Sequence, residues 1–219
     1  MKVVILCGGK GTRLREETEY RPKPMVPVGG RPILWHIMRR YAHYGHKEFI
    51  LCLGYKGDVI KDYFRNFRWH SEDVTLRLGD SNSVWFHHSL AEADWQVTLA
   101  DTGEESMTAY RLRAIEKYLG DDEHFLFTYG DGLGDIDINA SIDFHKAHKK
   151  LVTITAVHPP GRFGDLRLGD DDSILDFNEK PQAEGAFING GYMVMDRAVF
   201  NYLPNDPTVM FEQGPVRQL

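Results

Sequence analysis

Short apolar runs alternate along this chain with stretches of helical periodicity, and this order constrains the fold more than any other feature. The runs typical of buried strands are residues 3–7, 49–53, 125–129 and 151–157, and the helical stretches are residues 32–44, 58–67, 107–119 and 138–148. Parallel strands need long crossover connections, which helices usually provide. The alternation therefore predicts an α/β fold, in which helices cover both faces of a mostly parallel sheet.

Two segments depart from this order and predict antiparallel strands. Residues 74–88 ("VTLRLGDSNSVWFHH") and 95–102 ("WQVTLADT") alternate polar and apolar side chains, which indicates a β-rich antiparallel insertion at about residues 70–101. Residues 166–178 form a second expected hairpin, around "GDDDS". With no repeat and no flexible linker in sight, the prediction is a single domain over residues 1–219.

Composition excludes several classes of function. A net charge of −6 argues against nucleic acid or an acidic membrane as a partner, because both need a basic face. The sequence has neither an apolar stretch long enough to span a membrane nor the apolar core of a signal peptide. Cys7 and Cys52 lack the spacing of metal ligands and are expected to be free, buried thiols. These features predict a cytoplasmic protein.

A glycine-rich loop, "GGKGTRL", follows the first expected strand. Its glycines have no Cβ to keep a ligand away from their backbone N–H groups, and Arg13 adds a planar fork of donors suited to phosphate. Lys23 stands between two prolines, where it can meet a second phosphate. The loop lacks the G-K-[ST] end of a P-loop and the third glycine of a dinucleotide-binding fingerprint. We therefore expect a phosphate site of another kind, although a solvated turn with surface charges remains the alternative.

An aspartate ends the third apolar strand. Asp131 lies between two glycines in "FLFTYGDGLGDIDI". Ligands of open α/β sheets bind beyond the carboxyl ends of the strands, so this carboxylate should face the same crevice as the glycine loop. Next to a polyphosphate, the Asp131 carboxylate would repel the phosphate charges unless it held Mg²⁺. The alternative is an ordinary turn aspartate.

The motifs together resemble those of the sugar-1-phosphate nucleotidyltransferases. The string "LCGGKGTRLREETEYRPKPMVPVGGRPILWHIM" carries the resemblance, which continues through "GYKGDVIKDYF", "VTLADTGEESMTAYRL", "PPGRFGDL", "EKP" and "INGGYMV". It covers essentially the whole chain and is strongest for the glucose-1-phosphate cytidylyltransferase branch. It implies a Rossmann-like sheet, Mg²⁺ as cofactor, and transfer of a cytidylyl group from CTP to α-D-glucose 1-phosphate, giving CDP-glucose and pyrophosphate.

The resemblance also implies roles for particular residues. Asp131 would bind the metal together with a second aspartate, which in the family lies in a later segment that has no counterpart here. Arg13, Lys23 and Lys180 would carry the catalytic charges. The expected sugar contacts are Glu179, Lys180, Asn189 and Gly190. The expected nucleotide contacts are Leu6, Gly8, Gly9, Gly11, Thr12, Arg13, Lys23, Glu104 and Thr108.

Several of these assignments have a purely structural alternative. Ser106 could simply cap the helix that follows it, the Glu179–Lys180 pair could be surface charge, and the glycines after Asn189 could form a turn. The function could also be uridylyl or thymidylyl transfer, or nucleotide-sugar binding without catalysis. The antiparallel insertion favours a homo-oligomer. Residues 212–219 are typical of the first turns of a helix, so we expect the natural chain to continue.

Overall fold

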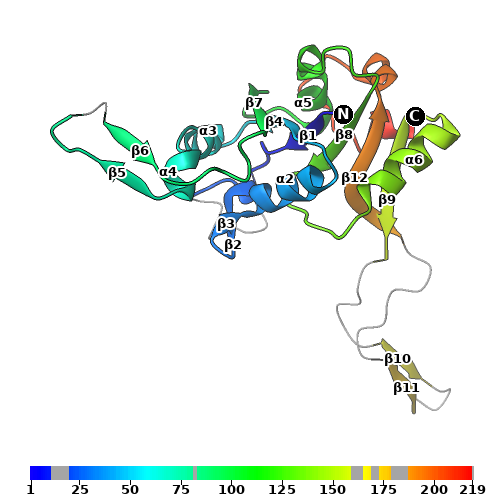
Figure 1. Ribbon diagram of the computed structural model, residues 1–219. Helices are drawn as coiled ribbons and strands as arrows, with labels where there is room; N and C mark the ends of the chain where they lie inside the picture. Colours follow the sequence, from blue (N-terminus) through cyan, green and yellow to red (C-terminus); the bar gives the residue numbers. More distant parts are fainter. Residues whose placement is uncertain (11–19, 81–82, 159–164, 169–172, 179–186, 219) are drawn as a thin grey trace.

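The computed structural model describes residues 1–10, 20–80, 83–158, 165–168, 173–178 and 187–218. A central sheet of six strands organises the fold, with the spatial order β7-β4-β1-β8-β12-β9 (Figure 1). In that order the strands are Gln96–Asp101, Glu48–Leu53, Val3–Leu6, His124–Tyr129, Ile188–Asp196 and Val152–Val157. Strands β7, β4, β1 and β8 run parallel to one another, whereas β12 is antiparallel to both β8 and β9. The predicted α/β fold with a mostly parallel sheet is confirmed.

Five α-helices lie in the described residues. They are α2 (Ile33–His43), α3 (Gly57–Arg65), α4 (Phe67–Ser71), α5 (Thr108–Ala114) and α6 (Ile138–His148). Four of them lie where helices were predicted, while α4 was not predicted. Helix α6 begins at Asp137, whose side chain accepts a hydrogen bond from the backbone N–H of Ala140. The expected helix over residues 107–119 is shorter than predicted, because a 3₁₀ turn at Glu116–Tyr118 replaces its last part.

Strand β1 shows how the two faces of the sheet are covered. Val3 and Ile5 belong to one buried cluster, and Val4 and Leu6 belong to another, because successive side chains of a strand point to opposite faces. The first cluster includes residues of α2, α3 and α6, and the second includes residues of α5 and of the 3₁₀ segment Arg197–Tyr202. Both faces of the sheet are therefore buried, as expected for a parallel sheet.

Three short hairpins lie outside this sheet. They pair β2 (Pro27–Val28) with β3 (Arg31–Pro32), β5 (Val74–Leu76) with β6 (Val84–Phe86), and β10 (Asp165–Leu168) with β11 (Ile174–Asn178). The second and third project from the body of the molecule (Figure 1). The predicted hairpin around "GDDDS" and the antiparallel pairing within residues 74–88 are confirmed.

The antiparallel pairing predicted for residues 95–102 is wrong. Strand β7 pairs in parallel with β4, from Glu48 opposite Gln96 to Leu53 opposite Asp101, and forms one edge of the central sheet. Its alternating pattern reflects its place at that edge, where one face is less covered, and such a pattern does not specify the direction of the neighbouring strand. Only the β5–β6 hairpin therefore departs from the main sheet in this region.

At the end of the chain, the helix predicted for residues 212–219 appears within the described residues only as turns and a 3₁₀ segment at Pro215–Arg217. In the parts of the chain that the structure describes, no helix has both the length and the apolar character needed to cross a membrane.

Candidate functional site

The register of the parallel strands places their carboxyl ends at one edge of the sheet. Leu6 of β1 lies beside Cys52 of β4 and beside Tyr129 of β8, and Cys52 lies beside Ala100 of β7. The loops that follow these strands therefore meet. This is the edge where open α/β sheets bind their ligands.

A pocket of about 200 Å³ opens at this edge. It is lined by six of the predicted nucleotide and metal residues, namely Leu6, Gly8, Gly9, Lys23, Thr108 and Asp131, and also by Cys7, Pro24, Ser106, Met107, Arg111 and Tyr129. A larger cavity, of about 730 Å³, lies between α3, α4 and the outer edge strand, but none of the predicted site residues lines it. The smaller pocket is the candidate site, because it lies at the carboxyl ends of the strands and combines a glycine loop with opposite charges.

Lys23 and Asp131 form an ion pair inside this pocket. The ammonium of Lys23 lies 2.5 Å from Oδ2 of Asp131, and both side chains remain partly exposed. Close packing of the two loops brings them together, since a Cβ at Gly130 would lie 2.8 Å from the carbonyl oxygen of Leu6 and 2.9 Å from Cγ of Pro24. Glycine before Asp131 thus allows the end of β8 to approach the turn that carries Lys23.

Gly8 and Gly9 differ in their surroundings. Gly8 is buried, and its carbonyl accepts hydrogen bonds from the backbone N–H of Tyr55 and from the Arg111 guanidinium. Gly9 is exposed, and no atom lies within 4 Å of where its Cβ would be. Gly9 thus leaves open space for a ligand beside the backbone. The predicted residues Gly11, Thr12 and Arg13 lie outside the described residues.

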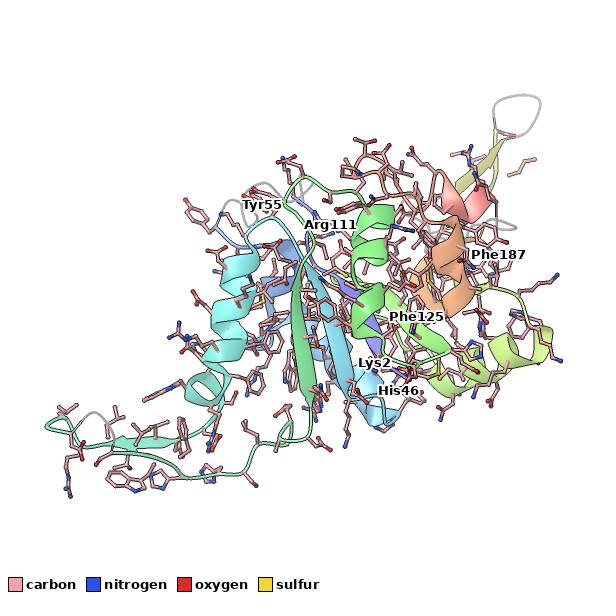
Figure 2. All side chains as sticks on the ribbon, turned by 90° about the horizontal axis from the view of Figure 1, so that it is seen from above. Lys2, His46, Tyr55, Arg111, Phe125 and Phe187 are labelled. Carbon is pink, nitrogen blue, oxygen red and sulfur yellow. The ribbon has the colours of Figure 1, made fainter. Side chains whose placement is uncertain are left out.

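Arg111 is a site residue that the sequence analysis missed. It is buried on the face of α5 toward the carboxyl ends of the central strands, close to Tyr55 (Figure 2). Its Nη1 donates to the Leu53 carbonyl at 3.0 Å and to Oγ1 of Thr102 at 2.9 Å, and its Nη2 donates to the carbonyls of Gly8 and Glu104, both at 3.1 Å. Burial lowers the pKa of this guanidinium from its ordinary value.

The four acceptors of Arg111 come from the loops after β1 and β7 and from Leu53, the last residue of β4. One side chain therefore ties the carboxyl ends of three strands together at the pocket. A signal for it exists in the sequence, because Arg111 falls three residues after Thr108 and four before Ile115, on the stripe of α5 that faces the core.

Of the two nucleotide-binding residues predicted in and before α5, one lines the pocket and the other does not. Thr108 lines the pocket, and its hydroxyl donates to Oε2 of Glu212 at 2.7 Å and accepts from the backbone N–H of Phe211 at 2.8 Å. Glu104 is exposed, and its backbone carbonyl accepts a hydrogen bond from Arg111, but Glu104 is not among the residues that line the pocket. The alternative in which Ser106 caps the helix is wrong, because Met107 occupies the N-cap and no side chain caps this end.

The predicted sugar residues Asn189 and Gly190 lie in β12, beside the end of β8. Oδ1 of Asn189 accepts from the backbone N–H of Gly191 at 2.8 Å. The register of β12 against β9 shifts between Asn189 and Met193, and such irregularities commonly redirect side chains next to functional sites. Glu179 and Lys180, the other predicted sugar residues, lie outside the described residues.

Both cysteines are free and buried, as predicted. Burial raises the pKa of Cys52 to about 12 and raises the pKa of Cys7 well above its ordinary value. Although Cys7 lines the pocket, its thiol is therefore protonated at neutral pH and is a poor nucleophile. Among the described residues, no group of three or more His, Cys, Asp and Glu side chains is arranged to bind a metal.

Comparisons with known proteins show which family the chain is similar to. The sequence model of the nucleotidyl transferase family matches residues 2–209. The chain is 54% identical to a glucose-1-phosphate cytidylyltransferase of Salmonella typhimurium over 221 residues, which cover all of this chain and 84% of that protein. It is 43% identical to a probable glucose-1-phosphate cytidylyltransferase of Bacillus subtilis, again over all of this chain and 84% of the relative.

Among solved structures, the fold is similar to that of HddC from Yersinia pseudotuberculosis. The TM-score is 0.65 at 24% identity, and the match covers 97% of this chain and 83% of that one. At this identity the likeness supports the fold alone.

Proposed function

The chain belongs to the nucleotidyl transferase family, and we propose that it transfers a cytidylyl group from CTP to α-D-glucose 1-phosphate, which yields CDP-glucose and pyrophosphate. Identity to the cytidylyltransferases along the whole chain supports these substrates. The structural observation that carries the mechanism is the pocket at the carboxyl ends of β1 and β8, which joins the glycine loop to the Lys23–Asp131 pair.

This reaction needs no nucleophile from the protein. The attacking atom is a phosphate oxygen of the sugar phosphate, which is already an anion, and the leaving group is pyrophosphate. The protein must hold two polyanions in line and offset their repulsion, so catalysis depends on positioning and on charge. The chemistry of the pocket fits this requirement, since its Cys7 thiol is protonated at neutral pH.

We assign the charge-offsetting role to Lys23 and Arg13. In the structure the Lys23 ammonium is held by Asp131, inside a pocket that already contains the glycine loop. When CTP enters, Lys23 exchanges this carboxylate for an oxygen of the α-phosphate, where negative charge builds up during transfer. Gly8 and Gly9 line the path of the phosphates, and Arg13 would receive the departing pyrophosphate.

Asp131 is the proposed metal ligand. Its carboxylate lines the pocket, remains partly exposed and already has a cation, the Lys23 ammonium, beside it. Mg²⁺ commonly binds through one or two carboxylates together with substrate phosphates, so this single carboxylate fits the ion. When bound there, Mg²⁺ supplies positive charge that offsets the charge of the phosphates.

The sugar phosphate is proposed to bind on the β12 side. Asn189 can exchange hydrogen bonds with sugar hydroxyls, and the backbone of Gly190, which packs closely against Thr155 and Val157 of β9, is the second proposed contact. From the family resemblance, Glu179 would accept hydrogen bonds from the sugar, and Lys180 would orient the attacking phosphate. On the nucleotide side, Thr108 and Glu104 are the proposed contacts.

Pyrophosphate release tests this function. The protein is incubated with glucose 1-phosphate, Mg²⁺ and one nucleotide at a time, chosen from CTP, UTP and dTTP. We expect release with CTP and formation of CDP-glucose. Release with only UTP or only dTTP would assign the chain to another transfer reaction. Tight nucleotide binding without any release would support a non-catalytic binding module instead.

We also propose that the protein self-associates through the β5–β6 hairpin. Leu76, Leu78 and Trp85 on and next to this hairpin are exposed, Leu78 to 95%. A two-stranded hairpin is only marginally stable by itself, and exposed apolar groups of this kind often mark contact surfaces. Light scattering after size-exclusion chromatography would show a multiple of the 25.1 kDa chain mass, and the double substitution of Leu78 and Trp85 by serine would reduce it.

A further inference from the structure

The carboxylate of Glu212, near the end of the chain, bridges two residues that line the candidate site. The Tyr129 hydroxyl donates to Oε1 of Glu212 at 2.5 Å, and the Thr108 hydroxyl donates to Oε2 at 2.7 Å. Tyr129 ends strand β8, two residues before Asp131, and Thr108 begins helix α5. Each oxygen of one carboxylate thus receives a hydroxyl from a different wall of the pocket.

The position of Glu212 is fixed by its neighbour Phe211. The Phe211 ring is fully buried and packs near Phe127 of β8, with 5.9 Å between the ring centroids. The backbone N–H of Phe211 donates to the Thr108 hydroxyl, and its carbonyl accepts from the N–H of Val216. Because side chain and backbone are both anchored, the carboxylate of the next residue is held in place over β8 and α5.

The Tyr129 side chain also contacts the strand of the proposed sugar side. A Cβ at Gly191 would lie 3.3 Å from the Tyr129 ring, so β12 packs closely against this side chain. Gly191 directly follows Asn189 and Gly190, the proposed sugar residues, and its backbone N–H donates to Oδ1 of Asn189. The position of this segment therefore depends on Tyr129, and that of Tyr129 depends on Glu212.

We propose that Glu212 is a positioning residue for the transfer reaction. It holds Thr108 on the nucleotide side and, on the sugar side, Tyr129, against which the Asn189–Gly191 segment of β12 packs, so that one carboxylate sets the spacing of the two substrate subsites. This inference rests on the proposed function and assigns a role to a residue outside the pocket lining. A carboxylate can accept both hydroxyls, whereas a glutamine in its place would present an N–H₂ donor to one of them.

Steady-state kinetics with both substrates test this role. Tyr129→Phe removes the link to the sugar side, so we expect it to raise the KM for glucose 1-phosphate about tenfold and to leave the KM for CTP nearly unchanged. Thr108→Val removes the other link, so the KM for CTP should rise by a similar factor. Glu212→Gln should raise both, and Glu212→Gln combined with Tyr129→Phe should raise the KM for glucose 1-phosphate no further than Glu212→Gln alone.

Glu123→Gln provides the matched control. Glu123 is exposed and directly precedes β8, at the end of the strand opposite to Tyr129. The same change of charge there should leave both KM values unaltered. Thermal melting of every variant separates a loss of folded protein from a change in KM. A purely structural role would lower the melting temperature, but Tyr129→Phe would then not act selectively on the KM for glucose 1-phosphate, nor Thr108→Val on the KM for CTP.

The outcomes are distinct. If Glu212→Gln keeps both wild-type KM values while the wild-type enzyme uses CTP, the positioning role is refuted and the proposed function stands. If Tyr129→Phe and Thr108→Val affect the two substrates alike, the division into two subsites is refuted. If the wild-type protein turns over no nucleotide, the proposed function is refuted and this inference with it.

Discussion

A methyl group at residue 8 would collide with the guanidinium of Arg111, so we expect Gly8→Ala to destabilise the protein. A Cβ at Gly8 would lie 2.1 Å from Nη1 and 2.5 Å from Cζ of Arg111, far inside van der Waals contact. The guanidinium cannot simply rotate away. Its two terminal nitrogens donate to four acceptors, and a Cβ at Gly54 would meet it just as closely, at 2.3 Å.

The size of the effect follows from the bonds that Nη1 makes. Moving Nη1 out of the way breaks its hydrogen bonds to the Leu53 carbonyl and to Thr102. Hydrogen bonds from a charged donor contribute about 1.5–3 kcal/mol each, so the free energy of unfolding should fall by about 3–6 kcal/mol. For a chain of this size, such a loss lowers the melting temperature by roughly 6–24 °C.

Calorimetric or fluorescence-detected melting measures this loss, with Gly9→Ala as the matched control. Gly9 is the next residue of the same loop, and nothing lies within 4 Å of where its Cβ would be, so its variant should melt close to the wild type. Arg111→Ala combined with Gly8→Ala should be no less stable than Arg111→Ala alone, because the new methyl group then enters vacated space.

Two results would refute this reasoning. If Gly8→Ala melts at the same temperature as Gly9→Ala, the guanidinium moves aside without loss of stability and Arg111 does not tie the strand ends together. If the effects of Gly8→Ala and Arg111→Ala simply add, the methyl group collides with something other than Arg111.

Three further predictions follow from other parts of the molecule. Lys23→Met should lower kcat about a hundredfold or more in the pyrophosphate-release assay, because it removes a charge placed at the reacting phosphate, and near-normal turnover would contradict that role. Burial and the neighbours His124 and His148 lower the pKa of His145 below 6.5, so the unfolded chain binds a proton at this residue more readily than the folded chain does. The free energy of unfolding should therefore fall as the pH drops below 6.5, and urea titrations of His145→Asn should show a weaker dependence on pH. Phe211→Ala should cost about 3–5 kcal/mol of stability through the cavity it leaves in the core, and a melting temperature equal to that of the wild type would show that the segment does not anchor there.

Local patterns were sufficient for much of the architecture. The helix predicted for residues 138–148 and the strand end at Tyr129 agree with the structure, and the first strand ends at Leu6, one residue before its predicted end, because periodicity and glycine positions act within a few residues. The same reasoning placed Asp131 and the glycine loop at one edge of the sheet, since all parallel strands present their carboxyl ends there. That prediction is confirmed by the shared pocket.

Contacts between residues far apart in the sequence could not be predicted from these patterns. The direction of β7 was predicted wrongly, because alternation identifies which side chains are buried but not which way the adjacent strand runs. Helix α5 carries both Arg111 and Arg113, and only the fold decides that Arg111 ends buried at the carboxyl ends of three strands.

The sequence by itself determined the class of fold and placed Lys23 and Asp131 together with the glycine loop, because strand, helix and loop preferences are encoded locally. Only the tertiary structure decided which distant groups complete that site. Glu212 meets Tyr129 across 83 residues and Thr108 across 104, and no local signal marks these partners. The physical reason is that a hydrogen bond depends on where the topology brings two groups together, whereas the pattern of a segment records only its own burial.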